Sequence, residues 1–232
     1  MTTLSVLSYN VRSLRDGREG AAEVIRYASP DVACIQEAPR FFRWRSRCAA
    51  LARRSSMVVV AGGGGAAHGN LLLCNLAVDV ERTATISLSH RPRTHRRAAT
   101  VAVCRKGGSR FALVGTHLDL AAPDRLKHVY ELFAKLHEVI GADVPVVLGG
   151  DVNESPGDPA WAVLASRLRD AYATAGDGPA TTFPASAPRT QIDGVFADRS
   201  LRIRDCRVLD EPPVATASDH RPVLATVELP PA

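Results

Sequence analysis

The sequence has few aromatic residues and no cysteine pair with the spacing of a metal site. Aromatic residues make up only 5% of the 232 residues, so Val, Leu, Ile and Ala must build the core. The cysteines stand singly among apolar neighbours, and their odd number, without a CxxC motif, argues against a disulfide framework and against a zinc cluster. We therefore expect buried, reduced thiols at all five positions, which are Cys34, Cys48, Cys74, Cys104 and Cys206.

Long apolar runs are also absent. No run approaches the roughly 20 residues that cross a bilayer, and Met1-Thr2-Thr3 leads into a strand pattern without the basic and apolar regions of a signal peptide. With 46% hydrophobic residues and a mean hydropathy near zero, the chain can still fill a sizeable core. Because neither a long linker nor an internal repeat occurs, we expect one domain over residues 1–232, monomeric and cytoplasmic.

Lysine is scarce, and the basic residues are unevenly distributed. Arginine supplies 26 of the 29 basic residues, and the formal net charge is +5. Residues 1–110 hold 18 basic against 7 acidic residues, whereas residues 111–232 hold 11 against 17. Two explanations stay open: a footprint for a polyanion such as nucleic acid, or a general bias towards arginine codons.

Short apolar strands alternate with helical stretches, which predicts an α/β fold. The order is not strictly βαβ, because hairpin-like pairs fill residues 57–118, and this indicates antiparallel strands within a partly parallel sheet. The predicted helices are Gly20–Ala28, Phe41–Arg54, Asp124–Ile140 and Pro159–Ala171. The predicted strands are Leu4–Asn10, Val32–Glu37, Met57–Ala61, Asn70–Asn75, Ala84–Ser89, Ala98–Arg105, Arg110–His117, Val144–Gly149, Ile192–Ala197 and Pro222–Glu228.

Polar side chains recur where these strands end. The clearest case is Val144–Leu148, which runs into Gly149-Gly150-Asp151-Val152-Asn153. In an extended chain residues 151 and 153 point the same way, so both can address one bound group, and the two glycines admit a close approach. Taken singly, each such residue also has an ordinary explanation as a turn, cap or core residue. The others are Asn10, Glu37, His117, Asp193, Asp219 and His220.

The order of these segments resembles the endonuclease/exonuclease/phosphatase superfamily. The matching segments cover most of the chain: Ser8-Tyr9-Asn10-Val11, Ile35-Gln36-Glu37, Gly115-Thr116-His117-Leu118, Gly150-Asp151-Val152-Asn153, Gln191-Ile192-Asp193 and Ser218-Asp219-His220-Arg221-Pro222-Val223, with a looser match at His68-Gly69-Asn70-Leu71. The resemblance implies a four-layer sandwich of two mixed β-sheets packed face to face, with helices on both outer sides. One departure is Gly194, where the family usually carries a bulky residue.

The resemblance also implies metal-dependent cleavage of a phosphoester. Mg²⁺ or Mn²⁺ would be held by Asn10, Glu37, Asp151 and Asp219, since Mg²⁺ prefers a few carboxylates together with water and phosphate oxygens. Asp151, fixed by Asn153, would activate the attacking water. His220 paired with Asp193, and His117, would act on the phosphate or the leaving group. Candidate phosphate contacts are Asn70, Arg97 and Arg125, with ordinary surface arginine as the alternative for the last two.

Three functions remain open. The first is a nuclease or related phosphodiesterase, with DNA or RNA as partner. The second keeps the scaffold and changes the substrate to a small phosphomonoester, an inositol phosphate or a phospholipid head group. The third is a binding scaffold that has lost its chemistry, which the full set of site residues disfavours.

Overall fold

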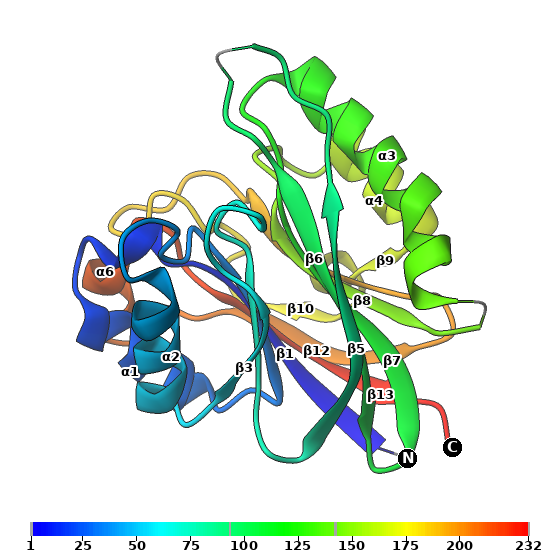
Figure 1. Cartoon of the computed structure of the whole chain (residues 1–232), viewed down its shortest axis with the longest axis horizontal. Helices are drawn as coiled ribbons and strands as arrows, with labels where there is room; N and C mark the ends of the chain where they lie inside the picture. Colours follow the sequence, from blue (N-terminus) through cyan, green and yellow to red (C-terminus); the bar gives the residue numbers. More distant parts are fainter. Residues whose placement is uncertain (1, 93, 142, 232) are drawn as a thin grey trace.

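The computed structural model describes residues 2–92, 94–141 and 143–231, and it contains two β-sheets packed face to face (Figure 1). The first sheet has the order β10-β12-β13-β1-β2-β4-β3, and the second has the order β5-β6-β7-β8-β11-β9. The strands of the first sheet are β1 (Thr2–Asn10), β2 (Val32–Gln36), β3 (Val58–Gly62), β4 (Leu71–Cys74), β10 (Gly176–Asp177), β12 (Arg202–Val208) and β13 (Val223–Leu229). Those of the second are β5 (Val78–Ser87), β6 (Ala98–Lys106), β7 (Ser109–His117), β8 (Val146–Asp151), β9 (Arg169–Asp170) and β11 (Asp193–Ala197).

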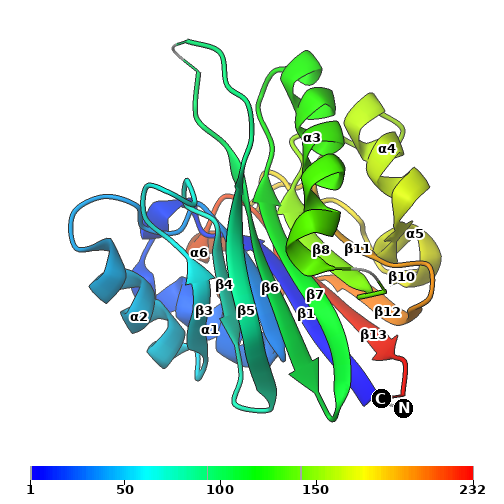
Figure 2. The same cartoon turned by 45° about the vertical axis from the view of Figure 1, so that its right-hand side comes forward.

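Helices cover the outer face of each sheet, so the predicted four-layer sandwich is confirmed (Figures 1 and 2). The first sheet packs against α1 and α2, and the second against α3 and α4, while a third apolar cluster fills the space between the sheets. The helices are α1 (Arg18–Ala28), α2 (Trp44–Arg54), α3 (Ala122–Ile140), α4 (Pro159–Arg167), α5 (Ala171–Ala175) and α6 (Val214–Ala217), with a 3-10 turn η1 (Arg12–Leu14).

Strand direction decides where the polar residues gather. β1 and β2 are parallel neighbours in the first sheet, and β7 and β8 are parallel neighbours in the second. The carboxyl ends of parallel neighbours lie at the same edge of a sheet, so the residues that follow these four strands are brought to one end of the sandwich. The same end receives the start of β11, because β11 runs antiparallel to β8.

Glycine allows the two sheets to approach closely near this end. A Cβ atom on Gly149 of β8 would lie 2.9 Å from the Cβ of Cys34 in the facing sheet, and one on Gly115 of β7 would lie 2.8 Å from Leu72 Cδ2. Real Cβ atoms do not pack this closely, so any larger residue at 149 would push β8 away from β2. The glycine before the acidic segment therefore serves sheet packing.

Most predicted elements are present, with ends shifted by at most three residues, but three regions differ. β5 begins at Val78 and not at Ala84, because this edge strand exposes residues 79–83 and shows no apolar alternation. The sequence prediction missed β12, whose charged residues face solvent, and the two-residue strands β9 and β10. The predicted helix Pro159–Ala171 ends at Arg167, because the Asp170 carboxylate accepts the backbone N–H groups of Tyr172 and Ala173 and so starts α5.

All five cysteines are buried and free, as predicted. Among the described residues, no helix is long and apolar enough to cross a membrane.

Candidate active site

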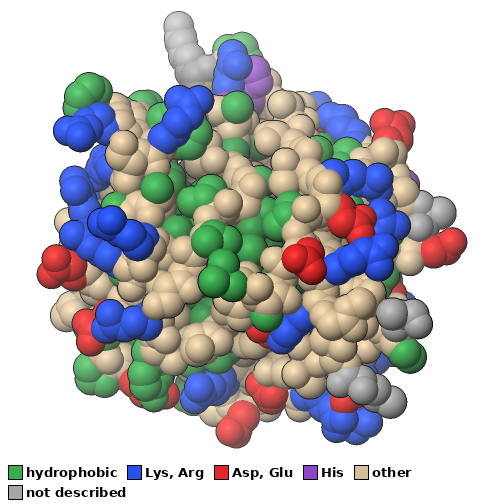
Figure 3. All heavy atoms as spheres, turned by 60° about the horizontal axis from the view of Figure 1, so that its bottom comes forward, with side chains coloured by type: hydrophobic (Ala, Val, Ile, Leu, Met, Phe, Trp, Pro, Cys, Tyr) green, Lys and Arg blue, Asp and Glu red, His purple; other side chains and the backbone are tan. Residues whose placement is uncertain are grey.

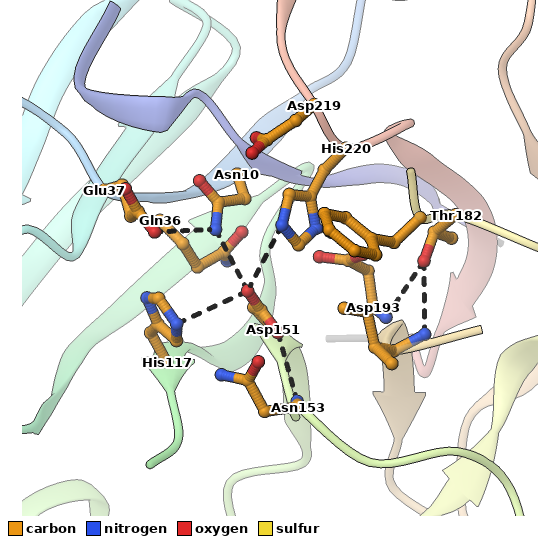
Figure 4. A network of polar contacts seen from close by, with 12 residues as sticks. Asn10, Gln36, Glu37, His117, Asp151, Asn153, Thr182, Asp193, Asp219 and His220 are labelled. Carbon is orange, nitrogen blue, oxygen red and sulfur yellow. Dashed lines mark hydrogen bonds and ion pairs between the residues drawn. The ribbon is translucent and has the colours of Figure 1, made fainter. Parts of the chain in front are cut away.

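The strand ends of both sheets deliver the predicted residues to one place (Figure 4). In the second sheet His117, Asp151 and Asp193 form a row across β7, β8 and β11, since Asp151 is the register partner of both of the other two. The first sheet supplies Asn10 at the end of β1 and Glu37 directly after β2. The convergence of these side chains, which the sequence predicts from strand ends, is therefore present in the structure.

Asp151 lies at the centre of the cluster. Its Oδ2 accepts a hydrogen bond from Asn10 Nδ2 at 3.0 Å and lies 3.3 Å from His117 Nε2 and 3.8 Å from His220 Nε2. Its Oδ1 accepts the backbone N–H of Asn153 at 3.1 Å. The carboxylate is thus held by four groups from four segments, which fixes its orientation.

Asn153 reaches this position by a turn and not by strand alternation. β8 ends at Asp151, and Asn153 has a left-handed φ of 54°, so the expected extended geometry of residues 151–153 is wrong. Its side chain donates to the carbonyl oxygen of Leu118 at 3.0 Å, which ties the segment after β8 to the segment after β7. Asn153 therefore positions Asp151 through its backbone N–H and its side chain.

His220 forms a buried pair with Asp193. The two atoms Nδ1 of His220 and Oδ2 of Asp193 lie 2.9 Å apart, and both side chains are almost fully buried. The ring of Phe183 lies against the His220 ring at a centroid distance of 4.9 Å, and the Thr182 hydroxyl oxygen accepts the backbone N–H of Asp193 at 3.3 Å. The pair fixes the His220 ring so that Nε2 faces Asp151 (Figure 4).

The shifted pKa values follow from burial and neighbouring charge. Burial and the nearby Asp193 raise the pKa of Asp151 to about 7. Burial alone would lower the pKa of His220, but Asp193 and Asp151 outweigh it and raise this pKa to about 9. Burial, with the positive charge of Arg97, holds the pKa of His117 well below its ordinary value. These shifts favour the imidazolium form of His220 and the neutral form of His117.

Glu37 and Asp219 lie on the other side of Asn10. Asn10 Nδ2 also donates to Glu37 Oε1 at 3.3 Å, while the Ser218 hydroxyl donates to the Asn10 carbonyl oxygen at 2.7 Å and so ties the segment before β13 to β1. Asp219 Oδ2 lies 3.1 Å from Arg12 Nε. The carboxylates of Glu37, Asp151 and Asp219 thus lie around Asn10, whose Nδ2 faces Glu37 and Asp151 while its Oδ1 accepts the backbone N–H of Arg12. Carboxylate and amide oxygens are the ligands that a hard divalent cation prefers.

A cavity of about 460 Å³ opens onto these residues. Glu37, His117, Asp151, Asn153 and His220 line its base and Phe183 part of its wall. Arginines and further histidines also line it, namely Arg15, Arg40, His68, His95 and Arg97, together with uncharged residues such as Phe41 and Leu120. Of the three predicted phosphate contacts, Arg97 is the one that reaches the cavity; its buried Nε has no hydrogen-bond partner among the described residues.

Asn70 and Arg125 have structural contacts away from the cavity. Asn70 Nδ2 donates to the carbonyl oxygens of Ala67 and Ala98, at 3.0 and 2.9 Å. Arg125 Nε donates to Glu154 Oε1 at 2.8 Å, and the Arg125 guanidinium also donates to two backbone carbonyl groups of the segment after β7. These contacts use the Nδ2 of Asn70 and the guanidinium of Arg125, whereas the buried Oδ1 of Asn70 has no hydrogen-bond partner among the described residues. Neither residue is among those that line the cavity.

Several residues of the site were not predicted as such. Thr182 and Phe183 lie in an irregular segment without periodicity, so the sequence offers no local signal for them. Ser218 was part of a matching segment, and its position next to Asp219 could have suggested a supporting role. The departure at Gly194 also has a cause: a Cβ there would lie 2.9 Å from Trp161, which fills the space that a bulky residue would take.

The comparisons with known proteins agree with the fold and the predicted resemblance. The sequence profile of the Endonuclease/Exonuclease/phosphatase family matches residues 7–220. No curated protein sequence is similar enough to match the chain. One similar solved structure is the endonuclease/exonuclease/phosphatase from Bacteroides vulgatus, at 22% identity, with 99% of this chain and 100% of that chain covered and a TM-score of 0.84.

Two other similar structures have more specific names. The mannosyl-6-phosphatase from Bacteroides thetaiotaomicron is 20% identical, with 98% of this chain and 99% of that chain covered and a TM-score of 0.83. D. rerio TDP2 complexed with single strand DNA product is 18% identical, with 98% and 100% covered and a TM-score of 0.77. At these identities the likenesses establish the fold. Since the family profile spans almost the whole chain, the chain belongs to the endonuclease/exonuclease/phosphatase family of metal-dependent phosphoric ester hydrolases.

Proposed function

We propose that the protein is a Mg²⁺- or Mn²⁺-dependent phosphodiesterase, in the first place a nuclease, that cleaves a P–O bond by in-line attack of water. The observation that carries the proposal is the arrangement around Asp151: one buried carboxylate faces Asn10 and two histidines, in a cavity that Arg15, Arg40 and Arg97 also line. Such a cavity attracts a phosphate and provides donors for the charge that develops on it.

The donor set at Glu37 fits a hard divalent cation. Glu37 lines the cavity, and the nearest partner of its carboxylate is the Asn10 amide at 3.3 Å. We assign the cation to Asn10, Glu37, Asp151 and Asp219, where it would neutralise negative charge on a bound phosphate. The carboxylate of Asp193 and His220 Nε2 are also near Asp151, but Asp193 Oδ2 is already bonded to His220, and we therefore assign these two a role as a pair.

The side chains divide the proton transfers as follows. Asp151 accepts a proton from the attacking water, whose oxygen forms the new bond to phosphorus as the bond to the leaving oxygen breaks. The His220 imidazolium, held by Asp193, donates a hydrogen bond to a phosphate oxygen and supplies the proton that the leaving oxygen takes up. His117 is neutral, so we assign it stabilisation of the transition state and not the role of a general acid. Arg97 contributes positive charge from the cavity wall.

Activity assays with site variants test this proposal. We expect hydrolysis that EDTA abolishes and Mg²⁺ or Mn²⁺ restores, in a screen of plasmid DNA, RNA, abasic duplex, sphingomyelin, inositol phosphates and nucleotides. Asp151→Asn and His220→Ala should lower kcat by at least ~10²-fold, because each removes a group that acts on the attacking water or on the phosphate during the reaction. The control Asp205→Asn removes an exposed carboxylate on β12 and should keep full activity. Full turnover by Asp151→Asn would refute the assignment.

A small phosphomonoester is the second candidate substrate. The cavity of about 460 Å³ is large enough for a sugar phosphate, and the similar Bacteroides thetaiotaomicron structure is a mannosyl-6-phosphatase. Salt dependence separates the two substrates: binding of a polynucleotide weakens steeply with salt because counterions are released, whereas a small phosphate gives a shallow slope.

We also propose that residues 1–232 form one catalytic domain. The first strand and the last strand are antiparallel neighbours, because Thr2 pairs with Leu229 in the first sheet. The site itself takes residues from both ends of the chain. The monomeric state and the cytoplasmic location stay predictions from the sequence.

A further inference from the structure

An arginine–aromatic segment, residues 40–47, borders the catalytic cavity. Its sequence is Arg-Phe-Phe-Arg-Trp-Arg-Ser-Arg, and it joins β2 to the first turns of α2. The Trp44 ring packs over Gly63 and Gly64 and anchors the segment to the fold. Phe41 and Phe42, in contrast, are 74% and 84% exposed. These two aromatic side chains contribute little to the core, so their positions need another explanation.

Phe41 connects two hollows of the surface. It lines the catalytic cavity together with Arg15 and Arg40. It also lines a neighbouring groove of about 530 Å³, where side chains of α1 and α2, Arg18 and Arg47 among them, surround Phe41 and Phe42. The groove therefore continues the path that leads to Asp151, with aromatic rings along it and arginines on both sides.

The arginines of this region have no acidic partner. Within residues 2–92, 94–141 and 143–231, none of Arg15, Arg40, Arg43, Arg45 and Arg47 forms an ion pair, a property they share with some strand arginines such as Arg202, whereas Arg105 and Arg110 pair with Glu81, and Arg204 pairs with Glu228. Figure 3 shows Lys and Arg side chains on the side of the molecule where α1 and α2 lie and also on the opposite side. Two of the guanidinium groups lie over aromatic rings, Arg40 over Phe41 at 5.1 Å and Arg45 over Trp44 at 4.4 Å.

We propose that the arginine–aromatic segment and the groove beside it bind a single-stranded polynucleotide that runs into the catalytic cavity. Bases would stack on Phe41 and Phe42, and the intervening phosphates would contact the unpaired arginines. This inference rests on the proposed phosphodiesterase function and names its substrate class. A repeating chain of bases and phosphates matches alternating aromatic and arginine side chains, whereas a small phosphomonoester fills only the cavity.

A duplex and a membrane surface match these features less well. In a duplex the faces of the bases are already stacked on one another, so exposed rings at the cavity entrance find no partner. Aromatic residues that enter a membrane project from a convex surface, whereas Phe41 and Phe42 line a hollow together with arginines. The binding experiment includes a duplex and lipid vesicles, so it can reveal either alternative.

Binding in the absence of turnover tests the inference. The wild-type protein in EDTA is titrated into fluorescein-labelled dT12, rU12 and a 12-base-pair duplex, and its binding to phosphatidylserine vesicles is measured by sedimentation. We expect either single strand to bind more tightly than the duplex and the vesicles, and the dT12 and rU12 arms to show which sugar is preferred. Phe41→Ala/Phe42→Ala should weaken single-strand binding by at least about tenfold.

Matched variants control for loss of surface area and charge. Tyr130→Ala removes a half-exposed aromatic ring on α3, on the other side of the molecule, and should leave binding unchanged. Arg43→Gln should lower the slope of log K against log salt by about 0.7, the value for one phosphate contact to a single strand, whereas Arg202→Gln on β12 should leave it unchanged. Thermal melting confirms that each variant is folded.

The other outcomes each overturn the inference. These are equal binding of the Phe41→Ala/Phe42→Ala variant and the wild type, a preference for duplex or for vesicles, and the absence of any binding. Hydrolysis of bis-p-nitrophenyl phosphate by the wild type with Mn²⁺ is measured in parallel. Turnover without single-strand binding would overturn only this inference, whereas the absence of turnover on this and the screened substrates would overturn the proposed function.

Discussion

The Asp193–His220 pair allows a prediction whose size depends on pH. Asp193→Asn keeps the shape of the side chain and removes its charge, so the 2.9 Å contact with His220 Nδ1 no longer favours the imidazolium. Burial lowers the pKa of His220, and in the variant less negative charge opposes this effect. The pKa should therefore fall from about 9 towards or below the ordinary 6.5. If the protonated ring is the active form, the variant loses activity most at high pH.

The magnitude follows from the protonated fractions. At pH 8 the imidazolium fraction would fall from roughly nine-tenths to about three-hundredths, whereas at pH 6 it would fall by only about a quarter. The ratio of wild-type to variant kcat/KM should therefore rise about 20-fold between pH 6 and pH 8, on top of a pH-independent loss from poorer orientation of the ring. Asp205→Asn, the same change at an exposed position, should give a ratio near one at both pH values.

The difference in stability between the wild type and Asp193→Asn should also depend on pH. A histidine whose folded-state pKa is raised stabilises the fold fully below its ordinary pKa, and this contribution disappears as the pH rises through the folded-state value. The difference in Tm between wild type and Asp193→Asn should therefore be larger at pH 6 than at pH 10. A kcat/KM ratio that is the same at pH 6 and pH 8 would refute the reasoning, because Asp193 would then act on the shape of the site and not on the charge of His220.

Three further predictions concern buried groups of the fold. Arg125→Ala should lower the free energy of unfolding by about 3 kcal/mol or more in urea titrations, because it leaves the buried carboxylate of Glu154 without its ion pair. Arg207→Ala, which breaks a solvent-accessible pair with Glu211, should cost about 1 kcal/mol or less, and equal losses would contradict this. Burial raises the pKa of Cys34 to about 12, and the other four thiols are buried as well, so DTNB at pH 8 should label no thiol in the native protein and five in guanidinium chloride. Because the unfolded thiols ionise first, stability should also fall as the pH rises from about 9 towards 12.

The sequence predicted the site where local pattern and topology agree. Asn10, Glu37, His117 and Asp151 directly end or follow buried strands, and parallel neighbours bring such ends together whatever the details of packing. The pairing of Asp193 with His220 could be predicted only through the family resemblance, because the two residues are 27 positions apart. Asp193 begins β11, and His220 lies in the loop before β13.

Arg125 and β5 show why the remainder escaped prediction. A guanidinium that follows a strand ending in a candidate catalytic histidine is chemically suited to phosphate. Only the fold reveals that the guanidinium of Arg125 is already bonded to Glu154. The first half of β5 exposes both faces at the edge of its sheet, so its sequence has no alternation to detect. The contact of Arg125 with Glu154 and the exposure of β5 to solvent both depend on the tertiary structure, which the local sequence does not specify.

The buried charges explain why the site needs both sheets. Asp151 and Asp193 are register partners on adjacent strands, and two buried carboxylates so close together repel each other. In this row of residues the second sheet supplies His117 but no positively charged side chain. His220 and Asn10 approach Asp151 from the first sheet, on the side of β13 and β1. The glycines at 115 and 149 make that approach close enough for hydrogen bonds between the sheets. Packing of the two sheets and ionisation of the site therefore depend on each other. A larger residue at Gly149 should separate Asp151 from Asn10 and His220, and should so lower activity although it replaces none of the proposed catalytic residues.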